Sequence, residues 1–485
     1  MSVSPTSNAP KMTGYRWSIC AMLFFATTIN YLDRQVLSLT WKDFIAPEFH
    51  WTDAQYGDIA GYFSIFYAIS MLFAGRFIDW MGTRRGFNWA IGVWSVGACL
   101  HAFCGIATSG ILTGTWMVGF EGAKESIGHV ADVARVAEVS VGLFIFARFI
   151  LAVGEAGNFP AAIKTTAEYF PKKDRAFATS IFNAGATVGA LSAPLLIPTI
   201  AAAWGWEASF LIIGAVGFIW IGLWLYFYHK PEATSRVNAA ELEYIRQDRA
   251  DEALHSPGGD SDKISFLALL RYRQTWAFAA GKFMTDGVWW FFLFWTPAYL
   301  SSVYHIKSSD TAGKLAIFVL YSITLLSIYG GWLPSYFVGK KGMSPYDGRM
   351  KAMLIFAFFP LLALFAQPLG HYTYWLPVII IGIAGAAHQA WSANIFSTVG
   401  DMFPRKAIAT VTGIGGMAGG VGSFLINKGS GKLFDYASNT QMVFMGFKGK
   451  EAGYFIIFSI CAVAYLIGWS IMKALVPKYE PIKDL

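Results

Sequence analysis

Four ionisable residues lie within two long apolar segments of this chain, where charges are costly. Asp33 and Arg34 lie in the apolar segment 17–39, and Arg148 and Glu155 lie in a later one. An ionisable side chain at membrane depth costs roughly 2.5 to 3.5 kcal/mol on insertion scales, so it is kept mainly where it faces water, a ligand or a partner. Together these residues predict a polar cavity that handles an anion and a proton.

The spacing of these residues indicates which of them can act together. On a helix, Arg148 and Glu155 lie about two turns and roughly 10 Å apart on nearly one face, and Asn158 lies one turn further along. Arginine can bind a carboxylate through two parallel hydrogen bonds, and a glutamate in a partly dry cavity can carry a proton. Adjacent helical residues point about 100° apart, so Asp33 and Arg34 should not face the same ligand. The alternative is that the charges pair, Asp33 with Arg148 or Arg34 with Glu155, and only hold two helices together.

The composition of the chain places it among polytopic membrane proteins. Of its 485 residues, 55% are hydrophobic and 14% are charged, and each membrane-spanning helix needs about 20 predominantly apolar residues. We therefore predict an all-α polytopic membrane protein with twelve transmembrane helices in two groups of six. The predicted segments are 17–39, 56–78, 87–108, 140–162, 176–200, 207–228, 275–303, 312–338, 350–369, 373–397, 407–427 and 453–475.

An internal repeat relates the two groups of helices. The stretch 169–176 (YFPKKDRA) resembles 402–409 (MFPRKAIA), and each follows the fourth helix of its group. Parallel repeats with a site between them near the bilayer midplane are typical of transporters whose halves rock to give alternating access. We divide the chain into an N-terminal six-helix half (1–228), a cytoplasmic linker (229–273) and a C-terminal six-helix half (274–485), and predict a pseudo-two-fold axis between the halves.

The distribution of lysine and arginine predicts the orientation in the membrane. Basic loops such as Arg84-Arg85 and Lys340-Lys341 fall on one side if the helices alternate, and the charged linker falls there too. Because short basic loops tend to stay in the cytoplasm, we predict a bacterial inner-membrane protein with both termini cytoplasmic. The same loops largely explain the net charge of +7, so we expect no nucleic-acid partner. Residues 1–14 show no pattern of a removable signal peptide.

The second half offers few charges but several groups suited to a hydroxylated ring. Tryptophan faces can stack on a sugar ring, and amide and hydroxyl groups can bind its hydroxyls. Alternatives stay open, because most tryptophans in membrane proteins are belt or packing residues, and a lone histidine is as often satisfied by a neighbouring helix. Lys282 and Asp286, four residues apart, can simply pair with each other. The candidates are Trp289, Trp290, Trp295, His388, Gln389, Trp391, Ser392 and Asn394.

Three further segments carry structural predictions. Residues 413–422 contain glycine pairs four apart, typical of a close helix-packing face. Residues 109–139 are longer than a short loop, and 121–138 mix charged and apolar residues as an amphipathic surface helix does. This insertion either caps the outer entrance or is inert. In the linker, Asn238 followed by Glu241 predicts a capping box that opens a short helix.

The segment 75–85 (GRFIDWMGTRR) matches the loop signature between helices two and three of the major facilitator superfamily, which the chain resembles. Asp79 beside Arg84 and Arg85 can form a charge relay that latches one arrangement of the halves; the alternative is that the two arginines only fix topology. Within the superfamily, the chain is most similar to the anion:cation symporter family and its hexuronate transporters. The stretches that carry this similarity are 30–34 (NYLDR), 148–160, 282–297 and 388–394 (HQAWSAN).

This resemblance implies a proton-coupled symporter that imports hexuronates such as galacturonate or glucuronate by alternating access. It implies that Asp33 and Glu155 carry protons, and that Arg34 and Arg148 hold the substrate carboxylate. The other expected substrate contacts are Tyr31, Asn158 and the candidates of the second half.

Other function classes are weighed against this one. A symporter for another sugar acid (galactonate, an unsaturated or a keto-deoxy uronate) and an organic-anion or phosphate exchanger stay open, because arginine pairs suit phosphate as well as carboxylate. A drug antiporter should carry Gly-Pro-x-x-Gly-Gly in its fifth helix, where this chain has SAPLL at 192–196. No metal motif or nucleotide loop indicates an enzyme, so we predict no cofactor and no metal. We expect a monomer in the lipid bilayer, because the fold forms its path without a partner.

Overall fold

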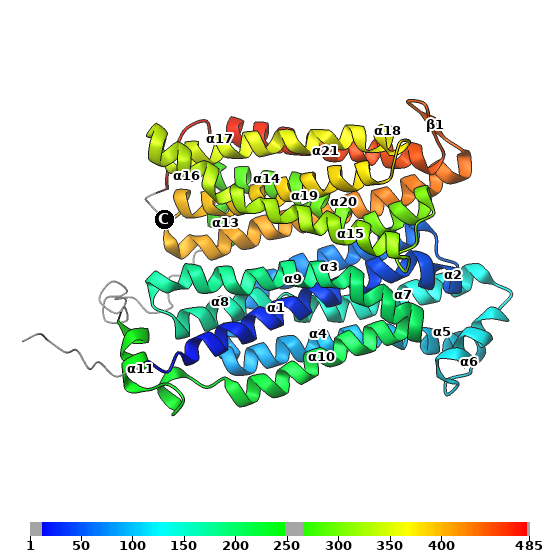
Figure 1. The fold of residues 1–485 in the computed structure, drawn as a ribbon, viewed down its shortest axis with the longest axis horizontal. Helices are drawn as coiled ribbons and strands as arrows, with labels where there is room; N and C mark the ends of the chain where they lie inside the picture. Colours follow the sequence, from blue (N-terminus) through cyan, green and yellow to red (C-terminus); the bar gives the residue numbers. More distant parts are fainter. Residues whose placement is uncertain (1–11, 248–264, 483–485) are drawn as a thin grey trace, which may run out of the picture.

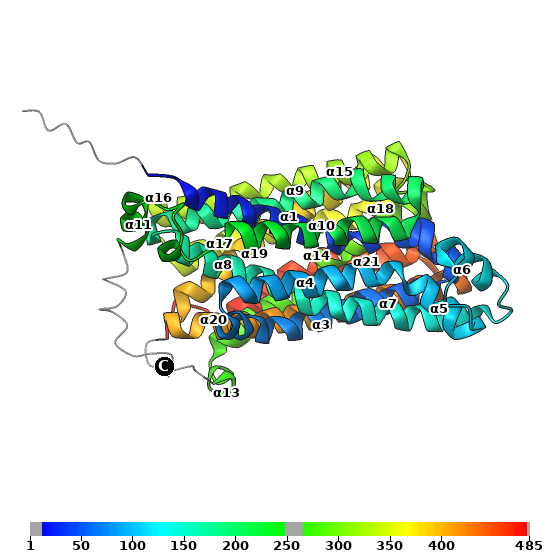
Figure 2. The ribbon, with the colours of Figure 1, turned by 90° about the horizontal axis from the view of Figure 1, so that it is seen from below.

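The protein is an elongated bundle of helices in its computed structural model, which describes residues 12–247 and 265–482. Most helices run along the long axis of the bundle (Figure 1), and the view from below shows the same alignment (Figure 2). We call the end that carries α11 (Ala239–Arg246) and α13 (Phe266–Leu269) the linker end. The opposite end, where α6 (Gly119–Gly128) lies, is the loop end.

The helices of the first half begin and end where local chemistry dictates. Thr52 and Gln55 form a capping box that starts α3, and Gly82, with a φ of 77°, ends it because glycine adopts positive φ without strain. The elements are α1 (Tyr15–Thr40), the π-helical turn η1 (Trp41–Ile45), α2 (Ala46–Phe49), α3 (Asp53–Met81), α4 (Thr83–Ala102), α5 (Cys104–Thr113), α6, α7 (Val133–Glu155), α8 (Asn158–Tyr169), α9 (Lys172–Trp204) and α10 (Trp206–Phe227).

The second half follows α11 and has longer helices at its centre. Ser344 caps α17 by accepting a hydrogen bond from the backbone N–H of Asp347 at 3.1 Å. The elements are α14 (Arg273–Tyr304), α15 (Thr311–Thr324), η3 (Leu325–Ile328), α16 (Tyr329–Lys341), α17 (Pro345–Phe358), η4 (Phe359–Phe365), α18 (Ala366–Gly370), α19 (Trp375–Met402), α20 (Arg405–Thr440), the hairpin β1 (Val443–Phe444) and β2 (Phe447–Lys448), and α21 (Lys450–Leu475). The short η2 (Pro231–Ala233) precedes α11.

The described residues contain the membrane-length helices that the sequence predicts. Eight of these helices are long and apolar enough to cross a membrane, and α4 with α5, bent by 52°, makes a ninth candidate. The helices α1, α14 and α20 have 26, 32 and 36 residues. Their lengths fit the remaining three of the twelve predicted segments. The predicted all-α membrane fold is confirmed.

The two halves pack most closely along α3 and α20. A methyl group added at Gly420 would lie 2.2 Å from the side chain of Ala68, and one added at Gly431 would lie 2.3 Å from the backbone oxygen of Asp53. Small residues allow this approach, because a side chain at either position would push the helices apart. Within the predicted packing face 413–422, Gly415, Gly419 and Gly420 make such close contacts, whereas Gly416 has no neighbour within 4 Å.

Polar contacts between the halves gather at the loop end. The carboxylate of Asp43 accepts hydrogen bonds from the hydroxyl of Ser301 at 2.6 Å and from the backbone N–H and hydroxyl of Ser308 at 2.7 and 2.8 Å. Asp53, at the start of α3, forms an ion pair of 2.5 Å with Lys450 of α21. These contacts tie the halves together at the loop end.

The insertion 109–139 differs from its predicted form. The amphipathic helix expected over 121–138 forms only in its first part: α6 buries Ala123 and Ile127 and exposes Glu121 and Glu125, whereas the residues from Val133 onward belong to α7. Asp132 separates the two helices, since its side chain caps α7 by accepting the backbone N–H three residues on. Lys124 of α6 lies 3.5 Å from Glu207 of α10, so the insertion docks on the first half.

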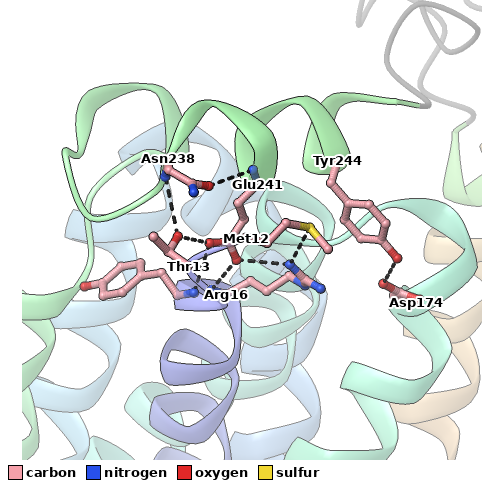
Figure 3. Close-up of polar contacts among 8 residues, drawn as sticks. Met12, Thr13, Arg16, Asp174, Asn238, Glu241 and Tyr244 are labelled. Atoms are coloured by element: carbon pink, nitrogen blue, oxygen red, sulfur yellow. Dashed lines mark hydrogen bonds and ion pairs between the residues drawn. The ribbon is translucent and has the colours of Figure 1, made fainter. Parts of the chain in front are cut away.

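The linker helix α11 is anchored to the start of α1 (Figure 3). Oε1 of Glu241 accepts the backbone N–H and the guanidinium of Arg16, both at 3.1 Å, and Oε2 accepts the N–H of Tyr15 at 3.0 Å and the hydroxyl of Thr13. Asn238 caps α11 as predicted, at 2.9 Å from the N–H of Glu241. The return bond of the predicted capping box is replaced, because the carboxylate faces α1 and the N–H of Asn238 donates to Thr13 at 3.4 Å. Residues 248–264 of the predicted linker lie outside the described residues.

Candidate functional site

An arginine–glutamate pair lies buried between α1 and α7. Arg34 donates two hydrogen bonds to one carboxylate oxygen of Glu155, Oε2, from Nε at 3.0 Å and from Nη2 at 2.7 Å. Both side chains are buried, that of Glu155 completely. Of the two charge pairings that the sequence allows, this one forms.

Aromatic rings from three helices surround the guanidinium of Arg34. Its central carbon lies 5.2 Å from the ring centre of Tyr31 on α1, 4.7 Å from that of Tyr67 on α3 and 5.0 Å from that of Trp290 on α14. A cation over an aromatic face is stabilised by about 0.5 to 2 kcal/mol, more when it is shielded from water. Because Trp290 belongs to the second half, both halves of the bundle meet at Arg34.

Arg148 and Asp33 lie beside this pair with unused hydrogen-bonding atoms. The guanidinium of Arg148 lies 5.0 Å from the ring centre of Phe63. Among the described residues, no hydrogen-bond partner is found for Nη1 of Arg148, for either carboxylate oxygen of Asp33 or for Oε1 of Glu155. Buried polar atoms in native proteins are nearly always satisfied. These atoms therefore mark a place where a polar ligand can bind.

Asp33 and Arg34 point in different directions, as helix geometry predicts. Arg34 turns toward α7 and Trp290, whereas Asp33 lies beside Trp94 of α4 and interacts with Arg148 through charge alone. The alternative ion pair between Asp33 and Arg148 is thus not formed. Of Asp33 and Arg34, a ligand between the halves would therefore contact Arg34.

The helix that carries Glu155 ends at that residue, and α8 begins at Asn158. The predicted common face is kept across this short turn, because Glu155 contacts Arg34 and Asn158 contacts Thr27, both on α1. Gly154 brings α7 against α4, since a methyl group there would lie 2.3 Å from the backbone nitrogen of Trp94. The amide of Asn158 faces α1 and donates to the hydroxyl of Thr27 at 3.5 Å.

His388, Trp289 and Tyr465 form a second polar cluster, within the second half. Nδ1 of His388 lies 2.7 Å from the hydroxyl of Tyr465. The ring of Trp289 stacks on the imidazole with 5.3 Å between the centres and 3° between the planes, and Trp391 approaches Tyr465 edge-on at 5.5 Å. The histidine is thus satisfied by a neighbouring helix, and the ring faces predicted for a sugar are partly used within the cluster.

The other second-half candidates also have protein neighbours. Asn394 donates to two backbone carbonyls, each 2.8 Å away. Trp295 donates to Asn427 at 3.0 Å, and Lys282 pairs with Asp286 at 2.7 Å. Their contacts with substrate stay predictions. The remaining candidates, Gln389 and Ser392, are half-buried on α19.

Comparison with known proteins decides the family. The model of the Major Facilitator Superfamily matches residues 23–426. The chain belongs to the major facilitator superfamily. It is similar to the hexuronate transporter of Escherichia coli K12, with 27% identity over 96% of this chain and 95% of the relative. It is also similar to the galacturonate transporter of Dickeya chrysanthemi, with 28% identity over 67% of this chain and 84% of the relative.

Solved structures support the same fold. A bacterial homologue of the human lysosomal transporter Spinster, in an inward-facing and occupied conformation, superposes with a TM-score of 0.66 and 18% identity. The match covers 95% of this chain and 97% of that one. At this identity the likeness concerns the fold. The fold predicted from the sequence, that of major facilitator superfamily transporters rather than of an enzyme, is confirmed.

The superfamily loop signature forms a different contact from the one expected. Asp79 pairs with Lys164 of α8 at 2.8 Å. Arg84 donates to the carbonyl of Leu225 at 2.7 Å, and Arg85 is exposed. In this arrangement Lys164 of the neighbouring helix reaches the carboxylate of Asp79, and the charge relay with Arg84 and Arg85 stays a prediction.

Several residues of the site carried no signal in the sequence. Phe63, Tyr67 and Trp94 lie in apolar helices, where an aromatic residue resembles any packing residue. The four-residue spacing of Phe63 and Tyr67 places them on one face of a helix. This spacing is the one feature of the sequence that could have predicted that both rings lie at the same site. Lys164 is the one basic residue of α8. Its partner Asp79 lies on another helix, so the sequence alone does not indicate the pair.

Proposed function

We propose that this protein is a proton-coupled symporter that imports a hexuronate, galacturonate or glucuronate, by alternating access. The observation that carries the proposal is the buried pair of Arg34 and Glu155, with the unused polar atoms of Asp33 and Arg148 beside it. Relatives named as hexuronate and galacturonate transporters support the substrate class.

The geometry of the pair suits an exchange of partners. Arg34 places two N–H groups on one oxygen of Glu155, and the same two groups can hold a substrate carboxylate. Two carboxylates that share one buried arginine repel each other unless one is protonated. A proton on Glu155 therefore frees Arg34 for the substrate, and loss of this proton restores the pair and expels the substrate.

The neighbouring residues complete the site. Arg148 offers a second cation with an unused Nη1, and Asp33 offers a second carboxyl that can take a proton. The rings of Tyr67 and Trp290 lie beside Arg34, where they can flank a sugar ring. Release requires the halves to move, and the contacts of Asp43 and the other loop-end residues keep that end closed in this arrangement.

The proposed function includes an orientation in the membrane and an oligomeric state. We propose that the linker end, where α11 lies, faces the cytoplasm of a bacterial cell and that both termini lie there. We propose that the protein acts as a monomer in the inner membrane.

Uptake into proteoliposomes tests this function. We expect labelled galacturonate to accumulate under an inward proton gradient, with glucuronate competing more strongly than galactonate. Glu155→Gln should abolish gradient-driven accumulation and retain exchange of labelled for unlabelled substrate, because glutamine resembles the protonated acid. Glu241→Gln is the matched control, since it alters a buried glutamate paired with an arginine at the linker end, outside the site. Uptake that ignores the gradient but requires substrate on the opposite side would indicate an exchanger instead.

A further inference from the structure

A groove lies between α17 and α21 near the linker end, away from the Arg34–Glu155 pair. Its volume is about 460 Å³. The lining combines an apolar surface with the ammonium groups of Lys351 and Lys473. The residues that matter here are Met343, Met350, Lys351, Leu354, Trp469 and Lys473.

The charges of the groove leave it positive. Lys351 is exposed, has no carboxylate partner among the described residues and lies 4.8 Å from the ring centre of Phe337. Lys473 lies 3.7 Å from one oxygen of Asp347, and the hydroxyl of Ser344 donates to the other oxygen at 2.7 Å. One acid, already hydrogen-bonded, thus faces two lysines.

Two further lysines strengthen this charge. Lys340 and Lys341 end α16, are exposed and immediately precede the groove residue Gly342. The start of α17, whose backbone N–H groups carry partial positive charge, lies at the same place. The groove therefore favours an anion.

Apolar side chains continue from the groove along both helices. Ile355 and Phe358 on α17 and Ile467 and Ile471 on α21 are exposed large hydrophobic residues. On membrane-spanning helices such residues face lipid chains. A molecule bound here would place a charged group at the lysines and a hydrocarbon chain along these residues.

We infer that this groove binds an anionic phospholipid, with Lys351 and Lys473 holding the phosphate of the headgroup. Lysine binds phosphate as a point charge, and basic pockets between transmembrane helices bind anionic headgroups. The site does not depend on the proposed substrate or on proton coupling.

Native mass spectrometry of the purified full chain tests this inference. The protein is mixed with dioleoylphosphatidylglycerol, with dioleoylphosphatidylethanolamine or with inorganic phosphate. We expect phosphatidylglycerol to stay bound in preference to the other two. Lys351→Gln combined with Lys473→Gln should weaken its binding by about 30-fold, since each lysine near the surface contributes roughly a factor of five.

Matched variants separate the outcomes. Lys432→Gln combined with Lys448→Gln removes the same charge from exposed lysines of α20 and β2 and should leave lipid binding unchanged, as should Lys351→Arg combined with Lys473→Arg. Equal loss in the Lys432 and Lys448 variant would overturn the site, as would undiminished phosphatidylglycerol binding in the glutamine variant. Inorganic phosphate that binds equally well and displaces the lipid would overturn the lipid as its ligand. Elution as a single folded species in size-exclusion chromatography confirms that each variant is intact.

Discussion

Two arginines of α1 form buried ion pairs with glutamates of other helices. The pairs differ in whether both oxygens of the glutamate accept hydrogen bonds. At the linker end both oxygens of Glu241 accept hydrogen bonds from the start of α1, among them two from Arg16 (Figure 3). At the centre, Arg34 uses one oxygen of Glu155, and the other oxygen has no partner among the described residues. The first pair is built to stay closed, whereas the second can exchange partners.

The surroundings of the two pairs support this contrast. The guanidinium of Arg16 also lies 4.7 Å from the ring centre of Tyr244, whose hydroxyl donates to Asp174 of α9 at 2.8 Å. The linker helix therefore joins α1 to α9. A buried ion pair is costly to break and rarely stabilises more than an apolar contact would, so its use as a fixed joint requires hydrogen bonds to both oxygens of the glutamate. The central pair lacks this satisfaction because, in our account, its partners include substrate and proton.

The largest effect should come from removing the central arginine. Arg34→Gln removes the two N–H groups proposed to hold the carboxylate, so we expect hexuronate uptake to fall by at least about 100-fold, as for other buried charge pairs that lose one partner. Arg16→Gln should leave uptake per folded molecule within about twofold. Comparable losses in both variants would erase the distinction between the pairs.

A smaller effect is expected from the aromatic ring that the second half contributes. Trp290→Leu removes a ring face 5.0 Å from the guanidinium of Arg34, and we expect the KM for galacturonate to rise about tenfold. Trp290→Phe retains a ring and should raise KM less. Equal effects of leucine and phenylalanine would show that volume matters at this position and the ring face does not.

The linker pair should control stability instead of transport. Glu241→Gln should lower the melting temperature in detergent by about 5 °C, because breaking one side of a buried pair costs about 3 kcal/mol. Its exchange of labelled substrate should remain. An unchanged melting temperature would contradict the role of this pair as a joint.

The pH dependence of this loss has a defined sign. Burial alone would raise the pKa of Glu241, but hydrogen bonds from Thr13, Arg16 and Tyr15 and the charge of Arg16 lower it below its usual value. A depressed pKa stabilises the fold above the unfolded pKa of about 4.3, and this contribution disappears as the pH falls through the folded pKa. The difference between the wild type and Glu241→Gln should therefore shrink in acid.

The smallest effect concerns a third acid, at the loop end. Burial raises the pKa of Glu48 to about 7, even though the indole of Trp206 donates a hydrogen bond to it at 2.8 Å. Because the folded pKa is above the usual value, the fold loses stability as the pH rises from about 4.5 to about 7. We expect the melting temperature of the wild type to fall by about 2 °C more than that of Glu48→Gln over this range. Parallel curves would contradict this.

The sequence predicted the charged centre because charges in apolar segments are rare and visible. Asp33, Arg34, Arg148 and Glu155 stand out against their neighbours, and their directions on a helix follow from its geometry. The sequence did not predict which pairing forms, Arg34 with Glu155 or Asp33 with Arg148, because this depends on where α7 packs against α1. The long apolar helices were predictable for the same reason, because they contrast with the polar segments between them.

The sequence was less informative where partners come from distant elements. Asn238 was recognised as a cap from local spacing, but Glu241 turns to Arg16, more than 200 residues away. Asp79 lies beside arginines in the sequence, yet it pairs with Lys164 of another helix. Tertiary packing decides such contacts, and one sequence does not encode it in a local pattern.

The most direct test of the central claim is the affinity of the purified protein for galacturonate as a function of pH. If a proton on Glu155 releases Arg34 for the carboxylate, wild-type affinity should fall as the pH rises. Glu155→Gln should bind with the wild-type affinity found in acid and lose most of this pH dependence. Affinity in Glu155→Gln that falls as steeply with pH as in the wild type would contradict the account.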